Sequence, residues 1–171
     1  MISDQGTYKL LLHGIDTVQC AYYLTPPASK HLDFRALAVI KEQLRMSKSR
    51  EPRAVRLGDT EFFVYPYGSG SGYPFVLTNE DFKIELGEFN SPSCFVTFRS
   101  QALWRQSAYT LHEKFLAWAK LVGCQTQQPE SLSRVDFCFD YSLSERDFDA
   151  DSFVSLSDKD SQHREHGAIQ T

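Results

Sequence analysis

Over most of the N-terminal third, the types and spacing of the apolar residues are those of a strand or of a helix. The segment Tyr8–Leu24 is rich in Leu, Val, Ile and Tyr and ends at Thr25-Pro26-Pro27. This is typical of a long strand that a proline turn closes. From Asp33 to Lys48 the apolar residues recur at three- and four-residue steps behind an aspartate. That spacing predicts an amphipathic helix whose first turn the aspartate caps.

The middle of the chain carries several short strand patterns with turn residues between them. β-type residues fill Ala54–Tyr67, and the glycine-rich run Gly68–Gly72 interrupts them. Tyr73–Leu77 and Phe82–Leu86 resume the strand character as one hairpin or short meander. Ser93–Arg99 is predicted to form a further strand.

The last predicted elements are a helix and a strictly alternating strand. Ser107–Val122 has an apolar stripe at helical spacing that stops at Gly123. Ser133–Tyr141 reads S-R-V-D-F-C-F-D-Y, so one strand face carries Val135, Phe137 and Phe139 and the other Asp136, Cys138 and Asp140. The order β-α-β-β-β-α-β predicts an α+β fold with a mainly antiparallel sheet and helices packed on one face.

Composition places this pattern in a folded, non-membrane protein. Hydrophobic residues make up 42% and aromatic residues 13% of 171 residues, which suits one globular domain. No apolar run approaches the roughly 20 residues of a membrane span, and the first ten residues do not resemble a signal peptide. The four widely spaced cysteines suit a reducing compartment. We therefore expect a cytoplasmic protein, with a domain over residues 1–143 and an acidic linker plus the start of a truncated next strand over 144–171.

The charge distribution allows contact with DNA at one place. A net charge of −4 argues against general nucleic-acid binding. Lys41–Arg56, however, holds six basic residues against two acidic ones. The candidate phosphate contacts in this stretch are Lys48, Arg50, Arg53 and Arg56. Three nearby tyrosines are candidates for stacking on unpaired bases: Tyr65, Tyr67 and Tyr73. The alternative is a solvated helix face that runs into a loop.

The alternating strand also carries the sharpest candidate for chemistry. Asp136 and Asp140 lie on one strand face, where two carboxylates can share a divalent cation. The alternative is a solvated face whose acidic residues pair with Arg134 or with a neighbouring strand. The sequence has no P-loop, no G-x-S-x-G elbow and no H-x-H pair.

Several segments together resemble a known family. They are H-G-I-D-T-V at His13–Val18, Y-P-F-V-L at Tyr73–Leu77, F-V-T-F-R-S-Q-A-L-W at Phe95–Trp104 and S-R-V-D-F-C-F-D at Ser133–Asp140. The chain in this respect resembles the rolling-circle replication initiators of plasmids and filamentous phages, from about Tyr8 to Tyr141.

The resemblance implies a nuclease related to the HUH fold that nicks and joins origin DNA, partly as a single strand. A tyrosine attacks the phosphodiester, and a divalent metal, Mg²⁺ or Mn²⁺, assists it. Carried onto this chain, the metal candidates are Asp136 and Asp140, with Asp16 and Glu85 as weaker ones. The nucleophilic tyrosine is expected in a later R-x-Y-D-K-like stretch that this sequence does not contain, so no catalytic residue is assigned and the chain alone is not expected to cut DNA.

Two other classes of protein fit the same residues. One is a non-catalytic DNA-binding accessory domain of a mobile element, which would bind through its arginines without metal. The other is a protein-interaction domain that uses an aromatic sheet face and has no salt-dependent DNA affinity. The sequence leaves the oligomeric state open between a monomer and a homodimer.

Overall fold

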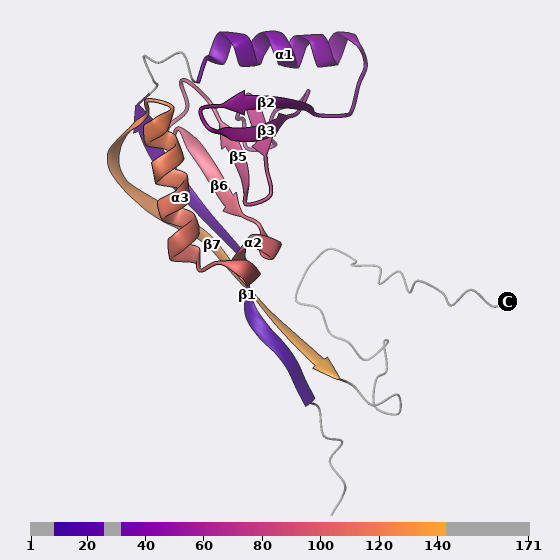
Figure 1. Cartoon of the computed structure of the whole chain (residues 1–171), viewed down its shortest axis with the longest axis vertical. Coiled ribbons are helices and arrows are strands. Elements are labelled where there is room, and N and C mark those ends of the chain that lie inside the picture. Colours follow the sequence, from indigo (N-terminus) through magenta and orange to yellow (C-terminus); the bar gives the residue numbers. More distant parts are fainter. Residues whose placement is uncertain (1–8, 26–31, 143–171) are drawn as a thin grey trace, which may run out of the picture. The chain divides into compact units, whose positions relative to one another are not determined.

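A computed structural model describes residues 9–25 and 32–142 of the chain (Figure 1). These residues form seven strands and three helices. In chain order they are β1 (Lys9–Thr25), α1 (Phe34–Met46), β2 (Arg53–Leu57), β3 (Thr60–Val64), β4 (Phe75–Thr78), β5 (Phe82–Leu86), β6 (Cys94–Phe98), α2 (Ser100–Arg105), α3 (Ala108–Leu121) and β7 (Gln125–Ser142).

The seven strands form one sheet in the order β2-β3-β4-β5-β6-β1-β7. Strands β2 to β6 therefore lie side by side in chain order, and the long strands β1 and β7 follow beyond β6. The five pairings from β2 to β1 are all antiparallel. At the first residue of β7, Gln125 exchanges two hydrogen bonds with Thr25, the last residue of β1, and these bonds anchor β7 to β1. The predicted α+β class with a mainly antiparallel sheet is confirmed.

Both long helices begin where the sequence predicts. The Asp33 carboxylate accepts hydrogen bonds from the backbone N–H groups of Arg35 and Ala36, at 2.8 and 3.2 Å. These bonds satisfy two donors that have no partner inside helix α1. Ser107 caps α3 in the same way, since its hydroxyl accepts from the N–H of Thr110 at 3.0 Å.

The helices pack on one face of the sheet through aromatic contacts. Phe62 of β3 lies 5.0 Å, centroid to centroid, from Trp118 of α3. Phe82 of β5 lies 6.0 Å from Phe115 in the same helix. On α1, Phe34 contacts Phe75 of β4. Phe62, Phe75 and Phe82 share one sheet face by strand register, so a single core lies between this face and the helices. All three helices contribute to this core, and among residues 9–25 and 32–142 none packs on the other sheet face.

The structure differs from the predicted element order at three places. The predicted strand Ala54–Tyr67 is a hairpin of two strands, because Gly58 adopts a positive φ of 69° in the turn between them. A short helix, α2, follows β6 and was not predicted. Strand β7 begins at Gln125, well before the predicted Ser133, through a stretch too polar to show alternation.

The chain divides into two compact units. Leu12–Asp140 is one unit and holds the sheet core and all three helices. The other unit comprises Met1–Leu11 and Tyr141–Thr171. The predicted acidic linker at 144–171 lies outside the described residues. Within those residues, no helix is both long and apolar enough to cross a membrane.

Candidate nucleic-acid interface

Two of the four predicted metal ligands lie on opposite faces of the sheet. Glu85 on β5 is buried, and its carboxylate accepts a hydrogen bond from Lys83 at 2.6 Å. In the strand register Glu85 faces Phe95, which faces Ala21 on β1. Asp16 is five positions before Ala21 and so lies on the other face, where the Ser100 hydroxyl donates to it at 2.5 Å.

The other two predicted ligands lie on β7, and one already has a partner. The Arg134 guanidinium donates two hydrogen bonds to Asp136, at 2.8 and 2.6 Å, and this contact raises the pKa of Arg134. Asp140 is exposed. Across residues 9–25 and 32–142, no three His, Cys, Asp or Glu side chains are grouped to hold a metal ion. The four carboxylates therefore do not form one metal site in this part of the chain.

The predicted DNA contacts lie at the opposite border of the sheet. Lys48 and Arg50 lie in the connection between α1 and β2, and Arg53 and Arg56 lie on β2, the outermost strand. We call Lys48, Arg50, Arg53 and Arg56 the basic edge. All four side chains are exposed. Ion pairs occur elsewhere in the described chain, but none involves these four.

Two basic-edge arginines have neutral partners only. Arg53 donates to the side-chain amide oxygen of Gln43 at 2.6 Å. Arg56 donates to the backbone carbonyl of Asp59 at 3.3 Å. Arg56 faces Glu61 in the register of β2 and β3, which reduces the net charge at that point. The basic edge keeps its positive charge available for phosphate groups because no carboxylate is bound to it.

A row of cross-strand neighbours connects this border to β1 over the helix-free face. Each residue of the row faces the next in the register of adjacent strands. From β2 to β1 the row is Ala54, Phe63, Thr78, Lys83, Thr97 and Gln19. It carries hydroxyls, one amide, one ammonium group and no carboxylate, which is a suitable surface for an anionic polymer.

A shallow groove of about 340 Å³ lies along this row. Its lining residues are Thr17, Tyr65, Thr78, Lys83, Thr97, Phe98, Arg99 and Ser100, which we call the sheet-face groove. The lining has five hydroxyl groups and two cations, but two of these groups are already bound to carboxylates: Lys83 is ion-paired with Glu85, and the Ser100 hydroxyl donates to Asp16. Arg99 is exposed at its border, where the guanidinium donates to the Asn79 carbonyl at 2.8 Å. Hydroxyl and guanidinium donors are the groups that position phosphates in nucleic-acid complexes.

Aromatic rings lie next to the groove. Phe63 is 43% and Tyr67 is 54% exposed. The rings of Tyr65 and Tyr67 lie 5.2 Å apart, tilted by 43°. Exposed rings of this kind bind unpaired bases by stacking, with little dependence on base identity. Phe63 is a member that the sequence argument missed, because its outward orientation becomes visible only once β3 is paired.

Tyr73, the third predicted stacking residue, is not available. It is buried, its ring packs edge-on against Phe95 at 5.6 Å, and its hydroxyl donates to the carbonyl of Pro92 at 2.8 Å. Burial raises its pKa above the usual range. The prediction that Tyr73 stacks on bases is therefore wrong. Its buried ring instead holds the end of the β3–β4 connection, to which Tyr73 belongs, against Phe95.

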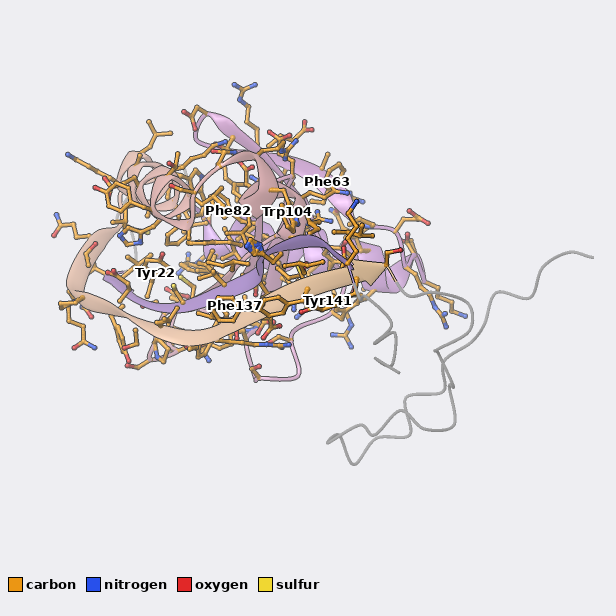
Figure 2. All side chains as sticks on the ribbon, turned by 90° about the horizontal axis from the view of Figure 1, so that it is seen from below. Tyr22, Phe63, Phe82, Trp104, Phe137 and Tyr141 are labelled. Atoms are coloured by element: carbon orange, nitrogen blue, oxygen red, sulfur yellow. The ribbon has the colours of Figure 1, made fainter. Side chains whose placement is uncertain are left out.

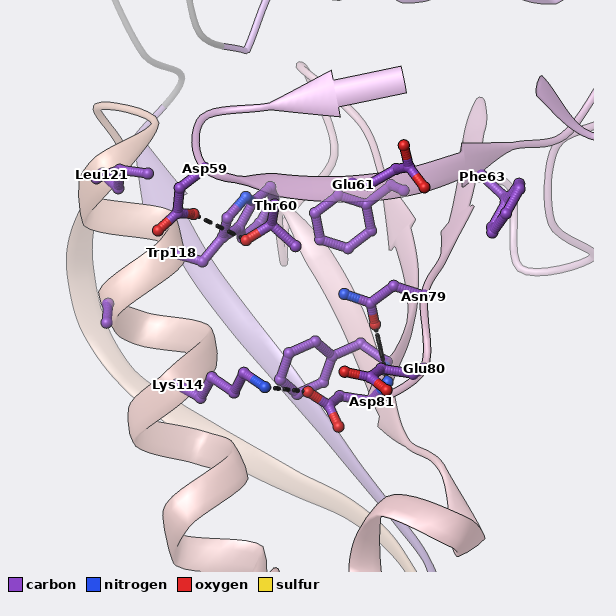
Figure 3. A pocket seen from close by; sticks show the side chains of 13 residues that line it. Asp59, Thr60, Glu61, Phe63, Asn79, Glu80, Asp81, Lys114, Trp118 and Leu121 are labelled. Atoms are coloured by element: carbon purple, nitrogen blue, oxygen red, sulfur yellow. Dashed lines mark hydrogen bonds and ion pairs between the residues drawn. The ribbon is translucent and has the colours of Figure 1, made fainter. Parts of the chain in front are cut away.

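A second, deeper cleft lies on the helix side and has the opposite charge. It encloses about 660 Å³ between the β2–β3 turn, the β4–β5 turn and α3 (Figure 3). Its carboxylates are Asp59, Glu61, Glu80 and Asp81, against the single cation Lys114. Lys114 is ion-paired with Asp81 (Figure 3). A cleft with this excess of carboxylates is unfavourable for phosphate groups.

Comparison of the chain with protein-family models, with curated proteins and with solved structures finds no match in any of the three.

Proposed function

We propose that this chain belongs to a replication initiator of the rolling-circle type and that the described residues bind origin DNA as a single strand. One observation supports the proposal above all others. The helix-free sheet face has a groove lined by hydroxyl groups, by Lys83 paired with Glu85 and by the exposed Arg99, and exposed aromatic rings lie beside it. Phosphates bind in the groove and bases stack on Phe63, Tyr65 and Tyr67.

The basic edge extends this surface for the DNA backbone. Ala54 and Arg56 of β2 face Phe63 and Glu61 of β3, so the helix-free face continues to the border of the sheet. A strand of DNA that leaves the groove toward β2 meets Arg56 there, and Arg50 lies in the connection just before the strand. Three carboxylates that contribute to the net charge of −4 line the helix-side cleft, namely Asp59, Glu80 and Asp81, whereas Glu61 faces Arg56 on the path and reduces the positive charge there.

Nicking and joining through a tyrosine, with Mg²⁺ or Mn²⁺, is part of the same proposal for the initiator as a whole. Asp136 and Asp140 remain its carboxylate candidates on β7. Asp136 can serve only if it exchanges Arg134 for the metal, because Arg134 holds both of its oxygens. A metal bound there would neutralise charge on the scissile phosphate and assist a phenol that is a weak nucleophile at its free pKa.

Fluorescence anisotropy with a labelled oligo(dT) strand tests the binding proposal. We expect Arg99→Glu in the groove, and Arg50→Glu/Arg53→Glu/Arg56→Glu at the basic edge, to weaken binding about tenfold or more. Lys120→Glu, an exposed position on α3, is the matched control and should bind like the wild type. Equal affinity of all four proteins would contradict the proposal.

Calorimetry with Mn²⁺ separates an initiator nuclease from a non-catalytic DNA-binding domain. If the protein is an initiator nuclease, we expect stoichiometric Mn²⁺ binding that Asp136→Asn/Asp140→Asn removes, with DNA binding retained. If it is a non-catalytic DNA-binding domain, we expect no Mn²⁺ binding by the wild type and an unchanged DNA affinity in the same variant. Retained far-UV circular dichroism shows that the variant is folded.

A further inference from the structure

Strand β7 is the last of the described strands in the sheet, and none of those strands pairs with its outer side. In the order of the described strands, only β1 lies beside it. None of its 18 residues is buried. Phe137, labelled in Figure 2, is 65% exposed, and Phe139 is 58% exposed. A long edge strand with apolar side chains and free backbone groups is a template for pairing with another strand.

The edge is interrupted at one place. Pro129 has no backbone N–H and cannot donate to a ladder, so a regular pairing is expected only after it. The stretch Arg134–Asp140, with the sequence R-V-D-F-C-F-D, lies beyond this proline and within the unit that contains the sheet core. It is also the stretch with the two exposed phenylalanines.

Strand geometry restricts how two copies of this stretch can pair. When two identical edges join antiparallel into one continuous sheet, a twofold axis perpendicular to the sheet relates them. Facing residues then lie on the same sheet face, so the axis passes through a residue and not between two residues. An axis at Arg134 sets arginine against arginine. An axis at Asp136 sets aspartate against aspartate, and an axis at Cys138 sets Asp136 against Asp140.

Three axes set Arg134 opposite a carboxylate. An axis at Leu132 pairs it with Glu130 but brings Pro129, which has no N–H to donate, into the ladder opposite Val135. An axis at Val135 pairs Arg134 with Asp136 but sets Glu130 against Asp140. An axis at Phe137 pairs Arg134 with Asp140 in both directions. It also sets Phe137 against its own copy and Val135 against Phe139, so the exposed apolar side chains of the two edges meet.

We infer that β7 pairs antiparallel with β7 of a second copy of this chain, about a twofold axis at Phe137. In the pair, Arg134 keeps its own Asp136 and gains the partner's Asp140, and Phe137 is covered by the partner's Phe137. The sheet becomes continuous through both copies. Both helix layers lie on one side of it and both sheet-face grooves on the other. The pairing itself does not depend on DNA binding.

Single cysteines locate the axis by disulfide formation. The background is Cys138→Ser, and the other three cysteines are buried and stay inert. Phe137→Cys should form a disulfide dimer under mild oxidation, since facing residues have Cα atoms about 4.5–5.5 Å apart. Val135→Cys and Phe139→Cys should not, because each lies roughly 13 Å from its own copy along the strand. A disulfide dimer of the Val135→Cys variant in place of the Phe137→Cys variant overturns the inference. The absence of a dimer in every one of the three variants overturns it as well.

Charge exchange tests the same pairing without oxidation. Light scattering behind a sizing column should give the wild type twice the mass of one chain. Asp140→Arg sets two arginines against each other and should give monomers, and Arg134→Asp/Asp140→Arg should restore the dimer. A monomeric wild type, or a double variant that stays monomeric while the wild type is dimeric, contradicts the register. The monomeric Asp140→Arg variant should still bind oligo(dT), which keeps this test separate from that of the proposed function.

Discussion

The hydroxyl of Tyr22 on β1 lies 2.9 Å from Nδ1 of His112 on α3. The other ring nitrogen of His112 lies 3.6 Å from the Glu130 carboxylate on β7. One polar chain thus connects two strands through a helix. Tyr22 is almost fully buried, and its ring packs 4.4 Å from that of Phe115. Its hydroxyl is hydrogen-bonded to His112, and a buried polar group that loses a partner destabilises the folded state.

Tyr22→Phe removes this hydrogen bond and keeps the ring. We expect the free energy of unfolding to fall by about 1 kcal/mol, measured by urea denaturation. Tyr65→Phe at the sheet-face groove is the matched control and should change the free energy of unfolding little. Equal stability of Tyr22→Phe and the wild type would show that the contact with His112 contributes nothing.

Alkaline pH should destabilise the fold through its buried thiols. Burial raises the pKa of Cys124 from 9.0 to about 11, and it also raises the pKa values of Cys94 and Tyr22. The folded state favours the neutral form, so this contribution is complete below pH 9 and is lost as the pH rises through about 11. Thermal melts should show a falling Tm over this interval. Cys124→Ala should reduce the slope, and an unchanged slope would contradict the assignment.

The ion pair inside the helix-side cleft stabilises the turn between β4 and β5. The Asp81 side chain is only 2% exposed and pairs with Lys114 and Gln106. Lys114→Met leaves this carboxylate without its main partner, and we expect a loss of about 1–3 kcal/mol in thermal or urea unfolding. Adding Asp81→Asn should recover part of the loss. If Lys114→Met is no less stable than Lys120→Met, the pair has no net effect.

A carboxylate placed in the sheet-face groove should repel DNA. Thr78 faces Lys83 across β4 and β5, so Thr78→Glu would place a second carboxylate beside an ammonium that Glu85 already pairs with, and the added charge would oppose a phosphate. We expect oligo(dT) affinity to fall about fivefold, or about 1 kcal/mol. Ala117→Glu adds the same charge to the exposed helix-side cleft and should leave affinity unchanged. Similar losses in both variants would show a general charge effect and no groove.

The sequence predicts best those features that neighbouring residues determine. Asp33 and Ser107 signal helix starts because a cap and its first turn are only a few residues apart. The five-residue alternation of Phe82–Leu86 gives β5 with its exact bounds. Helix α2 escapes prediction because its six residues are too few to show a helical period.

The candidate site depends on contacts between distant residues and was therefore only partly predictable. Thr78, Lys83 and Thr97 become neighbours through the pairing of β4, β5 and β6, which no local pattern reveals. The basic edge was predictable as a charge cluster. The two carboxylates of β7 were correctly placed on one strand. The contact between Asp136 and Arg134, two positions earlier, determines whether Asp136 is available to a metal.

Photo-crosslinking of an oligo(dT) strand that carries 5-iodouracil, followed by peptide mass spectrometry, tests the central claim most directly. Iodouracil couples to aromatic rings on which it stacks. The proposed DNA path predicts crosslinks at Phe63, Tyr65 or Tyr67 on the helix-free face, and their loss in Arg99→Glu. Crosslinks confined to the helical layer, for example at Tyr109 of α3, or no crosslink at saturating protein, would contradict single-stranded DNA binding at the sheet-face groove.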